Sequence, residues 1–88
     1  MHVKIIEDET KSFIAEFEGT ERSVVELIRE RVLAGKDVDF ASVEKDHPEL
    51  RTVRLVVKSS KNAKSLVLKA IDELQEEAKE LAAQIPKK

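Results

Sequence analysis

The last third of this 88-residue chain carries an apolar repeat that only an α-helix can gather on one side. Its members, spaced by four and three residues and followed by Pro86, are Val67, Ile71, Leu74, Ala78, Leu81 and Ile85. Asn62 is a suitable N-cap just before the repeat. The pattern therefore predicts one helix over residues 63–85, about 35 Å long at 1.5 Å per residue.

Four shorter segments instead alternate apolar and polar residues, which is the period of a half-buried β-strand. They span residues 3–7, 12–18, 38–45 and 52–58. The first two are expected to pair as an antiparallel hairpin, with Val3 and Ile5 on one side of the first strand. In the third, Val38, Phe40 and Ser42 are expected to share a side. Strands of this length extend about 17–23 Å, so the last helix must project beyond its own sheet.

A second helix is expected between the second and third strands. Ser23 and Glu26 have the spacing of a capping box, which predicts that the helix starts at Val24. Gly35 has the position of a left-handed C-terminal stop. The apolar residues of this helix spread over about 160° of its circumference, whereas packing on one sheet requires a stripe of about 100°. The excess predicts that the helix touches something besides its own sheet.

The order strand–strand–helix–strand–strand–helix predicts an α+β fold in two layers. We expect a four-stranded, mainly antiparallel sheet with both helices on one face, and residues 1–88 as a single domain. A domain of this size buries only about 60% of the surface of its unfolded chain. Such domains often gain stability from a partner.

The two helices supply the candidate binding surface. Beyond the reach of the strands, the stripe on the last helix has no element of this chain to cover it, and such stripes usually mark an interface. Arg29 and Arg31 are candidates for ion pairs across that interface, or for pairs within their own helix. The predicted interface residues are Val24, Val25, Leu27, Ile28, Arg29, Leu74, Ala78, Leu81 and Ile85.

Catalytic, cofactor-binding and metal-binding residues are not expected. The chain has no cysteine and two histidines, His2 and His47. Asp46, His47 and Glu49 share one loop, but without a second histidine or a cysteine they make a poor transition-metal site. With only two glycines, the chain also lacks a phosphate-cradling loop.

The charge balance argues against nucleic-acid binding as the main role. The chain has 16 basic and 18 acidic residues, for a net charge of −2, and the two signs are mixed along it. A nucleic-acid binder usually gathers a basic excess on one face. The sequence also lacks an N-terminal apolar run of a signal peptide and any apolar stretch of about 20 residues. We therefore expect a cytoplasmic protein.

Five segments in the same order resemble the archaeal RNA polymerase subunit L family, the smaller alpha-like subunit. They are residues 3–7, 18–29, 38–42, 46–50 and 62–71. Residues 18–29 are similar to the alpha motif of the family, in which a Glu-Gly pair leads to His-Thr-Leu-x-Asn-Leu-Leu-Arg. Here Arg22 and Ser23 stand in place of His-Thr, Glu26 in place of the asparagine, and Glu49 is inserted after the proline of the family's His-Pro turn.

The resemblance implies a non-catalytic assembly subunit of DNA-directed RNA polymerase, a nucleotidyltransferase complex. The family pairs with the larger alpha-like subunit of the polymerase, helices against helices, and the pair is a platform for the large catalytic subunits. The metal-binding carboxylates of the polymerase then lie on another polypeptide. Two alternatives remain open from the residues alone: a homodimeric adaptor that uses the same helical face, and a small α+β nucleic-acid-binding protein.

Overall fold

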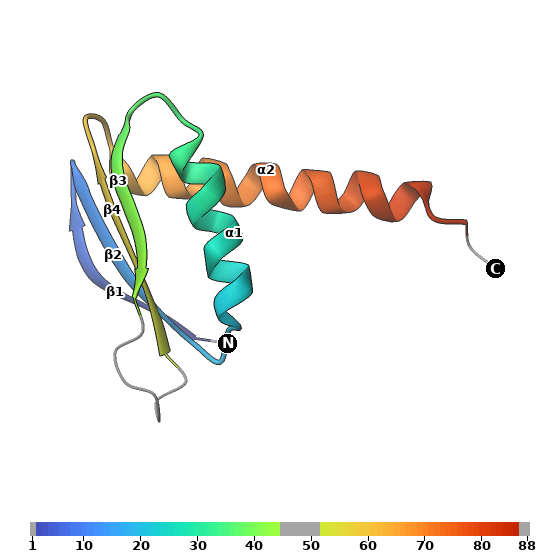
Figure 1. Ribbon diagram of the computed structural model, residues 1–88, viewed down its shortest axis with the longest axis horizontal. Helices are drawn as coiled ribbons and strands as arrows, with labels where there is room; N and C mark the ends of the chain where they lie inside the picture. Colours follow the sequence, from blue (N-terminus) through green and yellow to red (C-terminus); the bar gives the residue numbers. More distant parts are fainter. Residues whose placement is uncertain (1, 45–51, 87–88) are drawn as a thin grey trace.

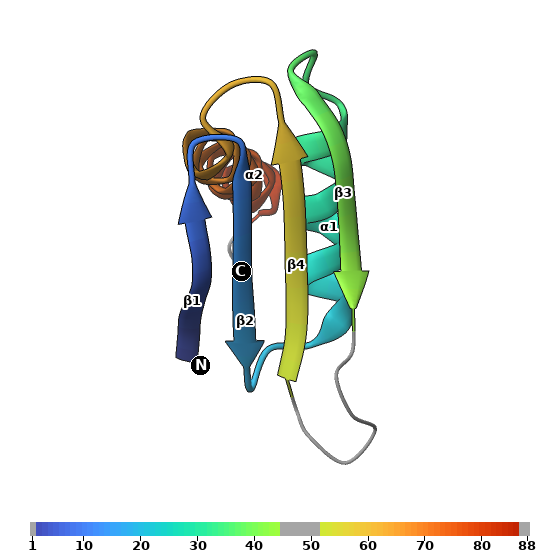
Figure 2. The same ribbon diagram turned by 90° about the vertical axis from the view of Figure 1, so that its left-hand side faces the viewer.

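The computed structural model of the chain describes residues 2–44 and 52–86. Four antiparallel strands form one sheet in the order β1-β2-β4-β3, and both helices lie on the same face of it (Figures 1 and 2). The elements are β1 (His2–Glu9), β2 (Ser12–Glu18), α1 (Arg22–Leu33), β3 (Val38–Glu44), β4 (Thr52–Ser59) and α2 (Ala63–Gln84). The predicted order and the two-layer α+β fold are confirmed.

The core lies between the helices and the two central strands. The helix-facing side chains of β2 and β4 pair across the strands and are all buried: Phe13 with Val57, Ala15 with Leu55, and Phe17 with Val53. The helices complete the core with Val25, Ile28, Val32, Ala63, Val67 and Ala70. The alternation in residues 12–18 and 52–58 therefore reports burial on one side of the sheet, as predicted.

The edge strand β1 contains a bulge that changes its alternation. Val3 and Ile5 pair with buried, helix-facing residues of β2, so both lie on the helix side of the sheet. A register shift between Ile5 and Glu7 then inserts one extra residue. As a result, Asp8 takes the next helix-facing position, opposite a buried phenylalanine of β2.

A second register shift, between Val38 and Phe40, corrects the prediction for the third strand. Val38 packs against the core, whereas Phe40 and Ser42 pair with residues that point away from the helices. Ala41 is buried on the helix side. The predicted common side for residues 38, 40 and 42 is therefore wrong at its first position, because the bulge reverses the alternation there.

The first helix starts earlier than predicted. Its N-cap is Glu21, whose side chain makes no capping hydrogen bond, so the predicted cap at Ser23 is wrong. The carboxylate of Glu26 lies 3.7 Å from Arg22 and 3.0 Å from Arg29. Because these two guanidinium groups engage Glu26, it does not complete a capping box with Ser23.

The end of α1 also differs from the prediction. Its C-cap is Ala34, in a right-handed conformation with φ −69° and ψ −15°, and the only glycine with positive φ in the described residues is Gly19, at 77°. Gly35 donates its amide hydrogen to the Val32 carbonyl oxygen over 3.0 Å. A Cβ atom at Gly35 would lie 3.2 Å from that oxygen. Glycine at this position therefore permits a close approach and not a left-handed turn.

The predicted N-cap of α2 is confirmed. The side-chain oxygen of Asn62 accepts a hydrogen bond from the Ser65 amide over 2.8 Å. We expect Asn62→Ala to lower the free energy of unfolding by about 0.5–2 kcal/mol, because an amide of the first turn loses its acceptor. Ser23→Ala, at an exposed position without a cap bond, should change it by less than about 0.5 kcal/mol. Urea denaturation compares the two variants, and the reverse ranking would contradict the assignment of the caps.

Candidate partner interface

Helix α2 extends well beyond the rest of the domain. Its 22 residues span about 33 Å at 1.5 Å per residue, and the helix runs along the longest axis of the molecule, 45 Å in extent (Figure 1). Every residue from 75 to 86 is exposed. Only the first half of α2 is therefore packed by its own chain. No helix within residues 2–44 and 52–86 is long and apolar enough to cross a membrane.

The apolar stripe of α2 passes from the core into solvent. Leu74 packs against the edge of the core, and Ala78 follows it at the first exposed turn. Leu81 is 64% exposed and Ile85, the C-cap residue, is 61% exposed. These four residues are spaced by four, three and four, so they lie on one side of the helix. The stripe thus continues as an apolar surface that no described element covers.

The wide apolar arc of α1 divides between two surfaces. Val25 and Ile28 are buried in the core, so their side chains are not available on the surface of the chain. Val24 and Leu27 are 45% and 54% exposed. They precede Arg31 by seven and four residues, which places them on the same side of the helix as Arg31. Because Arg31 reaches α2, the exposed part of the arc borders the second helix.

Arg31 connects the two helices where they cross. Its Nη2 donates to Glu77 Oε1 over 2.5 Å, its Nη1 also pairs with the Glu77 carboxylate, and Nη1 lies 3.6 Å from Glu73 Oε1. The hydrogen bond from Arg31 lowers the pKa of Glu77, and the same bond raises the pKa of Arg31. A two-pronged guanidinium–carboxylate pair fixes direction as well as distance. All three side chains are partly exposed, so the cluster positions α2 more than it stabilises the fold.

This ion pair predicts an acid-sensitive contribution to stability. Because folding lowers the pKa of Glu77 from its ordinary value of 4.5, the contribution is fully present above that value. It is lost as the pH falls through the lowered pKa. Glu77→Gln should therefore lower Tm slightly at pH 7, and its melting curve should converge with that of the unmodified chain towards pH 3. Glu76→Gln is the control, and an equal effect of both variants across this pH range would contradict the prediction.

The nine predicted interface residues fall into three groups. Six are exposed or half-buried along the two helices: Val24, Leu27, Leu74, Ala78, Leu81 and Ile85. Val25 and Ile28 lie beneath them in the core, and Arg29 is bound to Glu26 within α1. The sequence reasoning missed Glu73 and Glu77 as partners of Arg31. Their four-residue spacing, which places two carboxylates on one side of α2, was the available signal.

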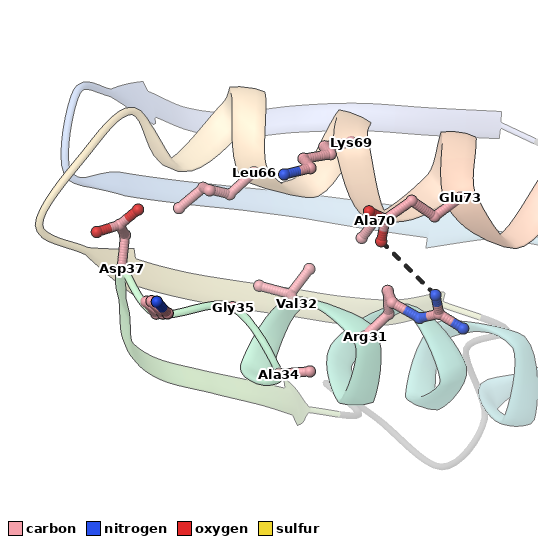
Figure 3. A pocket seen from close by; sticks show the side chains of 10 residues that line it. Arg31, Val32, Ala34, Gly35, Asp37, Leu66, Lys69, Ala70 and Glu73 are labelled. Carbon is pink, nitrogen blue, oxygen red and sulfur yellow. Dashed lines mark ion pairs between the residues drawn. The ribbon is translucent and has the colours of Figure 1, made fainter.

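A hollow of about 560 Å³ lies between the end of α1 and α2 (Figure 3). An ion pair between Arg31 and Glu73 crosses it, as Figure 3 shows. The other residues of its wall are Val32, Ala34, Gly35, Lys36, Asp37, Leu66, Lys69 and Ala70. None of them carries a hydroxyl, thiol or imidazole, so the hollow offers no nucleophile–base pair.

Metal binding is not supported by the described residues, which contain no group of three His, Cys, Asp or Glu side chains placed to hold an ion. The loop formed by Asp46, His47 and Glu49 lies outside the described residues. On the outer face of the sheet, Arg54 pairs with Glu16 over 2.7 Å, and Lys58 lies 3.5 Å from a carboxylate of β1. These pairings leave neither cation as the start of a basic patch, which is the usual footprint of nucleic-acid binding.

Comparisons with known proteins give a family and a fold. Residues 12–84 match the model of the family described as the RNA polymerase Rpb3/Rpb11 dimerisation domain. The structure is similar to the crystal structure of DNA-directed RNA polymerase subunit L from Thermoplasma acidophilum, with a TM-score of 0.83 and 21% sequence identity. That match covers 94% of this chain and 83% of the other. A comparison with curated proteins gives no match.

Proposed function

Since the chain belongs to the RNA polymerase Rpb3/Rpb11 dimerisation domain family, we propose that it is a non-catalytic assembly subunit of a DNA-directed RNA polymerase and pairs with the larger alpha-like subunit of that polymerase. The matched residues 12–84 include α1 and all of α2. The similar fold of a polymerase subunit L supports the same assignment. The function of this chain is then to bind, and the chemistry of the polymerase belongs to other subunits.

The observation that carries this proposal is the uncovered apolar stripe of α2. Leu81 and Ile85 are more than half exposed at the end of a helix that leaves the sheet. Large apolar side chains held in solvent on one continuous side of a helix are typical of a binding surface. Burial of each such side chain by a partner contributes about 1.5–3 kcal/mol.

The two helices together define how a partner would dock. The exposed side of α1, with Val24 and Leu27, borders α2, whose stripe runs through Ala78 and Leu81. The Arg31 cluster fixes the crossing between them. A partner helix that packs against both sides would be held in one orientation, because two apolar surfaces at an angle exclude sliding along either. The resulting heterodimer would then be a platform on which the large catalytic subunits assemble.

The test of the proposed function uses the full chain and the larger alpha-like subunit encoded in the same genome. Size-exclusion chromatography with light scattering should give a 1:1 heterodimer, and calorimetric titration should give a Kd of about 1 µM or tighter. Sedimentation of the chain alone and a DNA mobility-shift assay test the two alternatives. Strong self-association without a heterodimer, or salt-dependent DNA binding without one, would refute the proposal.

A further inference from the structure

The first half of β1 presents an apolar side that no described element covers. Val3 and Ile5 lie on the helix side of the sheet, yet they are 50% and 47% exposed. Figure 2 shows α1 behind β4 and β3, and α2 end-on behind β1 and β2 near one end of these strands. No helix lies behind the part of β1 where the strand begins. Isolated apolar residues on a surface are common, so their position must carry the argument.

The distribution of polar and apolar residues along β1 is the reverse of what its own fold requires. The helix-facing position nearest α2 is Asp8, which lies 3.5 Å from Lys64 in the first turn of that helix. The uncovered helix-facing positions are Val3 and Ile5. A sheet side that packs only within its chain places apolar residues where a helix covers it. The bulge after Ile5 separates the two regions, and bulges commonly re-aim side chains in this way.

The uncovered part of β1 adjoins the surface assigned to the partner. Val3 pairs with Phe17, close to the end of β2. From there the chain turns at Gly19 directly into the first turn of α1, which carries Val24. Figure 1 accordingly shows the N-terminal end of the chain and the start of α1 at the same end of the domain. The helix side of β1 and the exposed side of α1 are thus parts of one region.

We infer that Val3 and Ile5 form a further part of the surface that binds the larger alpha-like subunit, next to the exposed residues of α1 and α2. The inference rests on the proposed function and names strand residues that lie outside the matched residues 12–84. A specific interface buries about 800 Å² and about 20–30 residues on each partner, so the few exposed apolar residues of the helices need additional contact area. An apolar segment of the partner packed against β1 provides it.

The experiment compares Ile5→Glu with Phe40→Glu. Phe40 lies on the other edge strand, is 49% exposed, and pairs with Lys58 on the side of the sheet that faces away from the helices. Each full-length variant is titrated into the larger alpha-like subunit by calorimetry, and the free chains are melted in parallel. Ile5→Glu should weaken binding by about tenfold or more, whereas Phe40→Glu should stay within about threefold of the unmodified chain.

The outcomes separate this inference from the proposed function. Normal binding by Ile5→Glu, with weak binding by Leu81→Glu, overturns the inference and leaves the proposed function in place. No binding by the unmodified chain overturns both. Equal losses in the Ile5 and Phe40 variants also overturn the inference, because the effect would not depend on the helix side of the sheet.

A milder pair of variants covers the case in which Ile5→Glu does not fold. Ile5→Ala should then weaken binding by about threefold or more and Phe40→Ala should not, and equal affinities would overturn the inference. Sedimentation tests the other possible occupant of this surface. If Ile5→Glu dissociates a homodimer of the chain and binds the larger subunit normally, the surface is covered by a second copy and the inference is overturned.

Discussion

Leu81→Glu is expected to weaken association with the larger alpha-like subunit by about a hundredfold or more, which is the effect of losing a central apolar contact. Leu81 is 64% exposed in the half of α2 that no described element covers. Its replacement should therefore barely change the Tm of the free chain, as is usual for surface substitutions. In the complex, the new carboxylate would have to be buried without a partner. Calorimetric titration and thermal unfolding measure the two quantities.

Two further variants frame this prediction. Ala83→Glu introduces the same side chain at an exposed position two residues on, on the opposite side of the helix, and should leave affinity nearly unchanged. Leu74→Glu, which alters a residue packed against the core, should reduce both stability and affinity. If free Leu81→Glu unfolds while its folded fraction binds normally, then Leu81 belongs to the core and not to an interface.

Leu55→Ala is expected to lower the free energy of unfolding by about 2–5 kcal/mol, because it leaves a cavity in a packed core. Leu55 is fully buried, and its strand β4 lies between β2 and β3. Small domains are stable by about 0.05–0.15 kcal/mol per residue, so this loss removes a large part of the total. Urea denaturation measures it, and Leu68→Ala, at a residue 56% exposed on α2, is the matched control.

The same variant links the fold to the proposed partner. Since a partner that binds only the folded chain stabilises it, the larger alpha-like subunit should raise the Tm of Leu55→Ala in a concentration-dependent manner. A loss of less than about 1 kcal/mol in Leu55→Ala, equal to that of the Leu68 control, would contradict the central position of Leu55 in the core.

The elements that the sequence predicts well are those whose pattern reports burial directly. Residues 12–18 alternate because one side of β2 faces the core, and the strand has the predicted bounds. Asn62 was recognisable because capping involves only local atoms, here its own side chain and the Ser65 amide. The long helix followed from a repeat that no strand can place on one side.

The features that the sequence does not predict depend on partners distant along the chain. The bulges in β1 and β3 are properties of strand pairing, and alternation within one strand does not define its register. The capping box at Ser23 failed because Glu26 is engaged by two arginines. The role of Gly35 follows from the approach of the Val32 carbonyl, which a sequence pattern does not contain.

The candidate interface was predictable in extent but not in detail. The apolar arc of α1 is too wide for one sheet, but its angles alone do not show which part faces the core. The structure assigns Val25 to the core and leaves Val24 and Leu27 exposed. The position of the uncovered strand residues Val3 and Ile5 relative to the helices required the sheet order and the register.

The half-anchored α2 also acts as a lever arm. Beyond Leu74, residues 75–84 rise about 15 Å at 1.5 Å per residue, and no described element of the chain holds them. A rotation of about 10° at the anchored end would displace the tip of such an arm by about 3 Å. The Arg31 cluster lies close to the pivot. The angle set by this one guanidinium therefore determines, with amplification, where anything gripped by the tip lies relative to the sheet.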